Sequence, residues 1–158
     1  MRLISSANQD ALEARSVVAR DFLWLTGRHR ETGVLTTQGF WSGAKAVTAS
    51  VMDPDTGTSV VRTWAAAGGL IEISALPLVA NLTVQNATVT LSQIDEATAN
   101  IIRGYSVRFQ PVQVFRGLFH LDRLEMVSPG YARFVGVVNK VTISTPEEGS
   151  AGSITLEC

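Results

Sequence analysis

The stretch that decides the fold is residues 82–119, LTVQNATVTLSQIDEATANIIRGYSVRFQPVQVFRGLF. It reads as a strand, one short helix over about 92–103 and then further strands, in a chain whose other periodic segments are almost all strand-like. Ser92 and Asp95 have capping-box spacing, and Gly104 occupies the place of a left-handed helix stop. No side chain in the stretch looks chemically reactive, which favours an assembly part over an enzyme.

Outside this stretch, strands again dominate. A short helix is predicted near Ser6, which has capping-box spacing with Gln9, and a strand covered on both faces follows over 17–27. Strands over 46–52 and 59–65 flank the turn Asp53-Pro-Asp-Thr-Gly, a hairpin connection. We therefore expect a single β-rich domain over 1–158. Its fold class is mainly β: a curved antiparallel β-barrel or split barrel with one short N-terminal helix and one inserted helix.

Two strands change the parity of their apolar positions. The first change falls near Gln85 and Asn86, and in the second Val112 and Val114 hand over to Phe115. A strand keeps one face toward the core unless a bulge or bend intervenes, so we predict an irregularity at both places. Bends of this kind are used by strongly curved sheets and barrels.

Composition points to a protein with few surface charges. The 158 residues are 46% hydrophobic and 17% charged, with a net charge of −1, where soluble proteins have about 25% charged residues. Such a deficit fits either a tight small domain or a surface covered by partners. Blocks 1–52 and 101–140 are net positive, whereas 53–100 and 141–158 are net negative. The blocks are either complementary faces of neighbouring subunits in a ring or segments that intermix on folding.

Few residues are candidates for chemistry. His29 and His120 lie far apart in sequence, and although Asp122 follows His120, no serine stands in a nucleophile motif. The segment 53–57 resembles the start of a calcium loop but lacks the later ligands and the closing Glu. We therefore expect that the protein is not an enzyme and that it binds neither a metal nor a cofactor. No apolar run approaches the ~18 residues of a membrane span.

A basic series interleaved with aromatic residues occupies 103–140. It fits a nucleic-acid surface, a sheet with aromatic residues inward and Arg outward, or an Arg-rich protein interface. Adjacent carboxylates open the predicted inserted helix and complement its dipole. The candidate interface residues are Arg103, Arg108, Arg116, Arg123, Arg133, Trp41, Asp95 and Glu96.

Several short motifs together suggest a family. They are Leu91-Ser-Gln-Ile-Asp, Ile102-Arg-Gly-Tyr, Val114-Phe-Arg-Gly-Leu-Phe, Arg133-Phe-Val-Gly and Phe40-Trp-Ser-Gly. In these the chain resembles the N-terminal region of tail hub (tail-tip attachment) proteins of long-tailed bacteriophages and gene transfer agents. The resemblance covers most of the chain.

The resemblance implies a β-barrel-rich subunit of a homotrimeric ring beneath the tail tube, at the tail tip of a virion assembled from proteins made in the bacterial cytoplasm. Its partners would be its own copies, with a trimer favoured over a hexamer, and the tail tube, distal tail and tip fibre proteins. DNA would only pass non-specifically through the central channel. Some relatives continue into a cysteine-rich part that holds an iron–sulfur cluster. Cys158, the single cysteine, would be a ligand only if the chain continued.

Three other functions remain open on the sequence. The first is a distal tail ring protein, which also uses barrel domains around a channel. The second is a free-standing β-barrel carbohydrate-binding module that uses exposed Trp41 and Trp64. The third is a cell-wall hydrolase based on His120 and Asp122.

Overall fold

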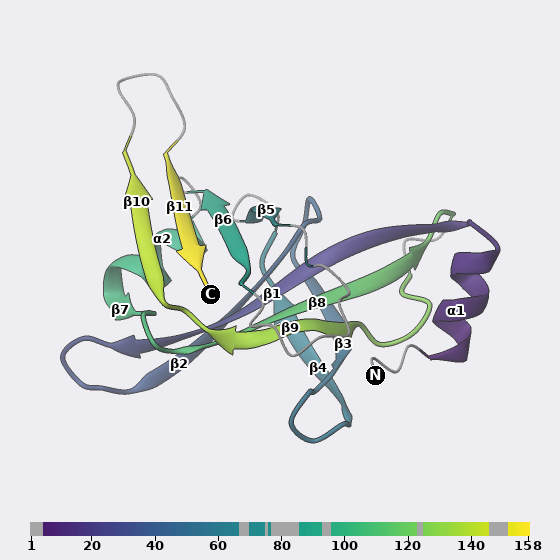
Figure 1. The fold of residues 1–158 in the computed structure, drawn as a ribbon, viewed down its shortest axis with the longest axis horizontal. Helices are drawn as coiled ribbons and strands as arrows, with labels where there is room; N and C mark the ends of the chain where they lie inside the picture. Colours follow the sequence, from purple (N-terminus) through teal and green to yellow (C-terminus); the bar gives the residue numbers. More distant parts are fainter. Residues whose placement is uncertain are drawn as a thin grey trace.

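The computed structural model describes residues 5–66, 70–74, 76, 86–92, 96–122, 125–145 and 152–158. Over these residues the protein is mainly β, with antiparallel sheets and two helices, as predicted (Figure 1). Helix α1 (Ser6–Glu13) lies at one end of the long axis, and helix α2 (Glu96–Gly104) lies toward the other end (Figure 1).

The largest sheet has the strand order β2-β1-β8-β9, and short β7 also pairs with β1. Strands β1 and β8 form its central pair, in continuous antiparallel register from Val17 opposite His120 to Leu25 opposite Val112. The length of β1 follows from its sequence, which is rich in apolar residues at both parities. The strands are β1 (Val17–His29), β2 (Leu35–Trp41), β7 (Tyr105–Ser106), β8 (Pro111–His120) and β9 (Tyr131–Val137).

A second sheet has the order β10-β11-β6-β5, and a hairpin forms a separate sheet of two strands. The hairpin is the one predicted around Asp53, with its strands within one residue of the expected ranges. The second sheet comprises β5 (Leu70–Ile73), β6 (Thr88–Ser92), β10 (Lys140–Ser144) and β11 (Ser153–Glu157), and the hairpin β3 (Val47–Met52) and β4 (Ser59–Trp64).

Two parallel bridges join the hairpin to the large sheet. Phe40 on β2 bridges Ala65 after β4, and Val51 on β3 bridges Gly130 before β9. Each bridge has two backbone hydrogen bonds of 2.8–3.2 Å. The path β1–β2–β4–β3–β9–β8 therefore returns to its start. Because each seam is a single bridge, the arrangement is a split barrel and not a continuously hydrogen-bonded one.

The β1–β8 pair separates two hydrophobic cores. On one face Phe22 and Phe115 pack inside the split barrel with Trp64 of the hairpin. On the other face, alternate residues of the same strands, such as Leu23 and Val114, pack against the second sheet and α2. Since neighbouring residues of a strand point to opposite faces, one pair of strands serves both cores.

This double role explains the parity change in β8. Val112 and Val114 face the core shared with the second sheet, whereas Phe115 faces the barrel interior, and the register of β8 with β1 is unbroken. A register shift does occur between Val114 and Phe115, but in the pairing with β9, where Arg133 is the extra residue. The irregularity was thus placed correctly along β8 but assigned to the wrong strand. The other predicted bend involves Gln85, which lies outside the described residues.

The predicted helices exist, but their caps were misplaced. The N-cap of α1 is Ser5, whose Oγ accepts a hydrogen bond from the Asn8 N–H, and not Ser6. Helix α2 is described from Glu96 onward, and Ser92 ends β6 opposite Ser153. The residues between them, which include Asp95 of the predicted capping box, lie outside the described residues. Gly104 is the last residue of α2, and its φ is not in the left-handed range, so the predicted left-handed stop is wrong.

Candidate interface surfaces

Arg116, one of the candidate interface residues, forms an ion pair within the chain. Its Nε and Nη2 donate to the two carboxylate oxygens of Asp21 at 2.8 and 3.0 Å, across the register pair that these residues form between β8 and β1. Hydrogen bonding to Asp21 raises the pKa of Arg116 above its ordinary value, against the opposing effect of burial. A bidentate pair of this kind fixes geometry, so Arg116 cross-links β8 to β1.

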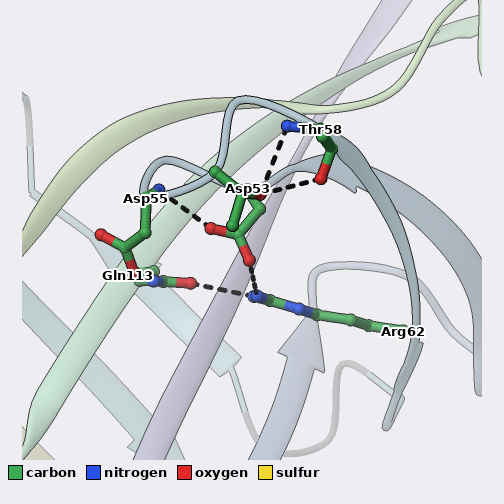
Figure 2. Close-up of polar contacts among 6 residues, drawn as sticks. Asp53, Asp55, Thr58, Arg62 and Gln113 are labelled. Atoms are coloured by element: carbon green, nitrogen blue, oxygen red, sulfur yellow. Dashed lines mark hydrogen bonds and ion pairs between the residues drawn. The ribbon is translucent and has the colours of Figure 1, made fainter.

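Arg62 was missed by the sequence analysis, although it is the only basic residue of the block 53–100. Its guanidinium donates to Gln113 Oε1 at 2.9 Å and lies 3.4 Å from Asp53 Oδ2 (Figure 2). It also stacks 4.5 Å from the centroid of the Trp24 ring. Desolvation by burial lowers the pKa of Arg62, and the charge of Asp53 offsets part of this shift. Arg62 thereby ties the hairpin to the β1–β8 pair.

The same contacts account for the segment that resembled a calcium loop. Asp53 Oδ1 accepts the Asp55 N–H at 2.9 Å, while Oδ2 faces Arg62. Its backbone N–H donates to Thr58 O, and its carbonyl accepts the Gly57 N–H, both at 2.8 Å (Figure 2). Within the described residues, no group of three or more His, Cys, Asp or Glu side chains is arranged for a metal ion.

The tryptophans do not form an exposed platform. Trp64 is fully buried in the split barrel, and its Nε1 donates to the Ala49 carbonyl at 3.3 Å. Trp41 is half-buried and stacks on Phe22 at 5.7 Å between ring centroids, with its Nε1 bonded to the Lys45 carbonyl. The expectation that Trp64 is exposed for sugar binding is therefore wrong, because its ring fills the barrel.

The remaining interface candidates differ in their surroundings. Arg108 is exposed, donates to the Asn139 carbonyl at 3.1 Å and stacks on Phe109. Arg133, the extra residue of β9, donates to the Leu76 carbonyl at 3.2 Å. Arg103 is exposed in the last turn of α2, where a cation complements the helix dipole. Arg123 and Asp95 lie outside the described residues, and Glu96 is described only as the first residue of α2.

Arg103 has basic neighbours from a distant part of the sequence. Arg28 pairs with Ser106 and His29 with Tyr105, so the end of β1 lies beside β7, directly after α2. Arg30 Nη2 donates to the Ile102 carbonyl at 3.3 Å. The fold thus brings the basic cluster 28–30 to the C-terminal end of α2, a proximity that follows from non-local pairing and has no signal in the sequence.

Both histidines have local structural contacts. His29 Nδ1 accepts the N–H groups of Glu31 and Thr32 at 3.3 and 3.2 Å, and its ring meets Tyr105 edge-on. His120 is the last residue of β8, and its backbone N–H donates to the Glu125 carbonyl. The side chain of Asp122 is exposed and lies on the turn after β8.

Cys158 belongs to the core beside the second sheet. Its side chain is buried, and its backbone N–H and C=O both bond Ala87, at 2.8 and 3.0 Å. Desolvation raises the pKa of the thiol to about 11. A buried neutral thiol is a poor nucleophile and a poor metal ligand, so Cys158 packs as an apolar residue in this structure.

Large apolar side chains remain on the surface, in several places. Val61 on β4 and Phe109 before β8 are among the most exposed, with 68% and 63% of their surface accessible. An open groove of about 550 Å³ runs between β3 and residues 125–129, with Phe119 and Met126 among its apolar lining. The other exposed large apolar residues are Leu12, Val34, Leu35, Met52, Leu121, Val135, Val137 and Ile143.

A comparison with known protein families and with curated proteins finds no match to this chain. No helix in the described part of the chain is both long and apolar enough to cross a membrane.

Proposed function

We propose that this protein is a structural subunit of a phage tail tip, a hub-type ring component that connects the tail tube to the tip. The observation that carries the proposal is the surface: within the described residues ten large apolar side chains are exposed, on α1, both sheets, the hairpin and the connections. Exposed apolar groups that lie next to one another mark protein contacts, whereas single ones are ordinary. Val135 and Val137 share one face of β9, and Val34 and Leu35 are consecutive in the β1–β2 hairpin. The low charged fraction has the same meaning, because an obligate subunit covers much of its surface with neighbours.

The polar residues support a scaffold role. Arg62 and Arg116 hold strands together, and His29 organises a turn. A split barrel flanked by a second sheet also fits the resemblance to hub proteins in the motifs of residues 91–136. In this proposal the ring is a homotrimer beneath the sixfold tube, its neighbours are tail proteins, and DNA passes through the channel without specific recognition.

Electron microscopy of tail tips tests this proposal. Antibody or gold labelling of a tagged copy should mark the tail tip, and averaged images should show threefold symmetry at the labelled layer. Sixfold symmetry would instead identify a distal tail ring. Unlabelled tips in particles that contain the protein would contradict the proposal altogether.

Two further functions have direct tests. A carbohydrate-binding module would quench Trp fluorescence on sugar binding, but Trp64 is buried and Trp41 is stacked on Phe22. A cell-wall hydrolase would lose lytic activity in a His120→Ala, Asp122→Ala variant. Equal lysis by the wild type and this variant would remove these residues from any lytic chemistry.

A further inference from the structure

The split barrel is open at the seam between β3 and the segment that leads into β9. This seam is held by the single parallel bridge between Val51 and Gly130. Continued parallel pairing would place Val47 beside Met126, but Met126 forms its bridge with β8 instead. The two segments therefore diverge from the bridge, and the groove of about 550 Å³ lies between β3 and residues 125–129.

Strand β3 turns backbone groups toward this groove. The bond from the Asp53 N–H to the Thr58 carbonyl, at 2.8 Å, marks the odd-numbered residues of β3 as those bonded to β4. The even-numbered residues face the other edge, where Ser50 O accepts the Gly130 N–H at 2.9 Å. The Ser50 N–H and both backbone groups of Thr48 share that edge, and within the part of the chain that the structure describes they have no backbone partner across it.

The opposite wall of the groove also presents backbone groups to it. The Val127 N–H donates to Leu118 O, and the His120 N–H donates to Glu125 O, both at 2.9 Å. These two bonds flank the bridge that Met126 forms, so the N–H and C=O of Met126 point away from β8, toward the groove that this residue lines. An extended segment in the groove would therefore meet hydrogen-bonding groups on both sides.

The side chains of the groove differ between its inner and outer faces. Val47, Phe119 and Met126 line the groove and pack in or against the barrel core. Thr48 and Ser50 lie on the opposite face of β3, because neighbouring residues of a strand point to opposite faces. The groove is thus apolar toward the barrel and carries hydroxyl groups toward the outside, which fits a segment whose apolar and polar residues alternate.

Strand β3 lacks the features that protect a free edge. Natural edge strands are guarded by charged side chains, proline or bulges that prevent pairing with another chain. The strand Val47–Met52 (VTASVM) contains neither a charged residue nor a proline, and its register with β4 is regular. An edge of this kind is typical of a strand that receives another strand.

We propose that an extended segment of another protein inserts into this groove as an added strand beside β3. Its backbone pairs with Thr48 and Ser50, and its apolar residues, at every second position, face Phe119 and Met126. Added strands gain affinity from main-chain hydrogen bonds and specificity from the sites of the alternate side chains. The contact would join the subunit to a neighbouring protein of the tail tip, and in this respect the inference rests on the proposed function.

A second copy of this chain is a poorer occupant than a different protein. A strand held between the two walls of the groove must be free along both of its edges. Every described strand of this chain already pairs along at least one edge. The described part of a second copy therefore has no strand to insert without breaking one of its own sheets.

Nuclear magnetic resonance of the full chain with a synthetic peptide tests the contact. The probe is acetylated and amidated Thr-Val-Thr-Val-Thr at millimolar concentration, and the control peptide carries N-methyl groups on both valines. The probe should shift the amide signals of Thr48, Ser50 and Met126 and slow their hydrogen exchange. The amide of Ser59, on the outer edge of β4, should not change. The control peptide has the same side chains but lacks two N–H donors, so it should have no effect.

Proline substitution then identifies the edge responsible. Thr48→Pro removes an N–H that faces the groove and none that bonds β4, and it should weaken binding of the probe about tenfold or more. Ser59→Pro is the matched control, because it removes an N–H from the outer edge of the same hairpin and should leave binding unchanged. Equal circular dichroism spectra of the two variants and the wild type would show that the loss is local.

Four results would overturn the inference. They are equal effects of the two peptides; no shift of the Thr48 and Ser50 amides with the probe; slow exchange of these amides in the free protein that is lost when residues 2–4 are deleted; and protection that rises with protein concentration and disappears in Thr48→Pro. The third would assign the groove to this chain's own N-terminus, and the fourth to a second copy.

The tail-tip location and the added strand fail separately. Labelled tail tips without binding of the probe would remove only the added strand. Binding of the probe by a protein that is absent from tail tips would remove only the location.

Discussion

At the scale of single residues, Arg62 is the main polar link between the hairpin and the central strands. Its side chain is only 14% exposed, and it contacts an acid, an amide and two aromatic rings. A cation held over aromatic faces and partly removed from water interacts more strongly than an exposed ion pair. Arg62 thus has a structural role.

Arg62→Ala should lower the free energy of unfolding by about 2 kcal/mol, because it removes the cation–π contact and leaves Gln113 and Asp53 without their partner. The free energy of unfolding of the Arg62→Lys variant should lie between those of the wild type and Arg62→Ala, since an ammonium keeps the charge but cannot span both partners. Urea denaturation measures both. Arg20→Ala, at an exposed arginine, is the control. Equal midpoints for the Arg62→Ala and Arg20→Ala variants would show that the Arg62 contacts contribute no net stability.

The buried thiol of Cys158 predicts that the free energy of unfolding depends on pH in the alkaline range. Burial raises the thiol pKa from 9.0 to about 11, so the unfolded chain loses this proton first as the pH rises. The stabilisation is fully present below about pH 9 and is lost between pH 9 and 11. Two pKa units correspond to on the order of 3 kcal/mol.

The measurement is denaturation of the wild type and of Cys158→Ala at several pH values across this window. The variant lacks the thiol but keeps every other titrating group, so the difference between the two curves isolates Cys158. That difference should narrow from pH 9 to 11. A constant difference would mean that the thiol is no harder to ionise in the folded chain than in the unfolded one.

At the scale of elements, local sequence signals predicted which helices and strands form. Pairing with distant segments decided where each of them ends. The hairpin around Asp53 was predicted because Pro54 and Gly57 supply turn geometry within the loop itself. The end of β6 at Ser92 depends on its pairing with Ser153, some sixty residues away, in β6–β11. The same holds for Arg133, whose place as the extra residue depends on how β9 meets β8.

The candidate interface residues also depend on non-local pairing that the sequence does not reveal. Arg103 and the basic cluster 28–30 lie far apart in the sequence, and only the β1–β7 pairing places them at one end. The ion pair of Arg116 with Asp21 also had no signal in the sequence, because it depends on the register of β1 and β8. Side-chain exposure therefore could not be inferred from charge and parity alone.

Two glycines of different elements should respond in opposite ways to alanine. A Cβ at Gly104 meets nothing within 4 Å, so Gly104→Ala should be neutral or stabilising by up to about 1 kcal/mol. A Cβ at Gly39 would lie 2.7 Å from the Thr63 carbonyl and 2.8 Å from the Trp64 ring, at the seam between β2 and β4. Gly39→Ala should therefore destabilise by about 2 kcal/mol or more.

Thermal unfolding of the two variants checks this order. A higher or unchanged melting temperature for Gly104→Ala and a clear drop for Gly39→Ala are expected. If Gly104→Ala were the more damaging change, α2 would have to end in the left-handed conformation after all.

At the scale of the whole molecule, the shared β1–β8 pair joins two cores that have separate partners. The barrel core uses the hairpin, and the other core uses the second sheet and α2. Because Phe22 and Leu23 are neighbours on opposite faces of β1, neither core can lose its packing without exposing the strand that supports the other. We expect the described chain to unfold as one cooperative unit.

The three tryptophans make this testable, because all of them lie in or against the barrel core. Leu156 of β11 is fully buried in the other core, so Leu156→Ala should cost about 2–5 kcal/mol through a cavity remote from every tryptophan. If the two cores are coupled, Trp fluorescence and far-ultraviolet circular dichroism will shift by the same amount in urea. A circular dichroism transition that moves while the fluorescence transition stays would show that the split barrel folds by itself, and that the second sheet is a separate unit docked on its wall.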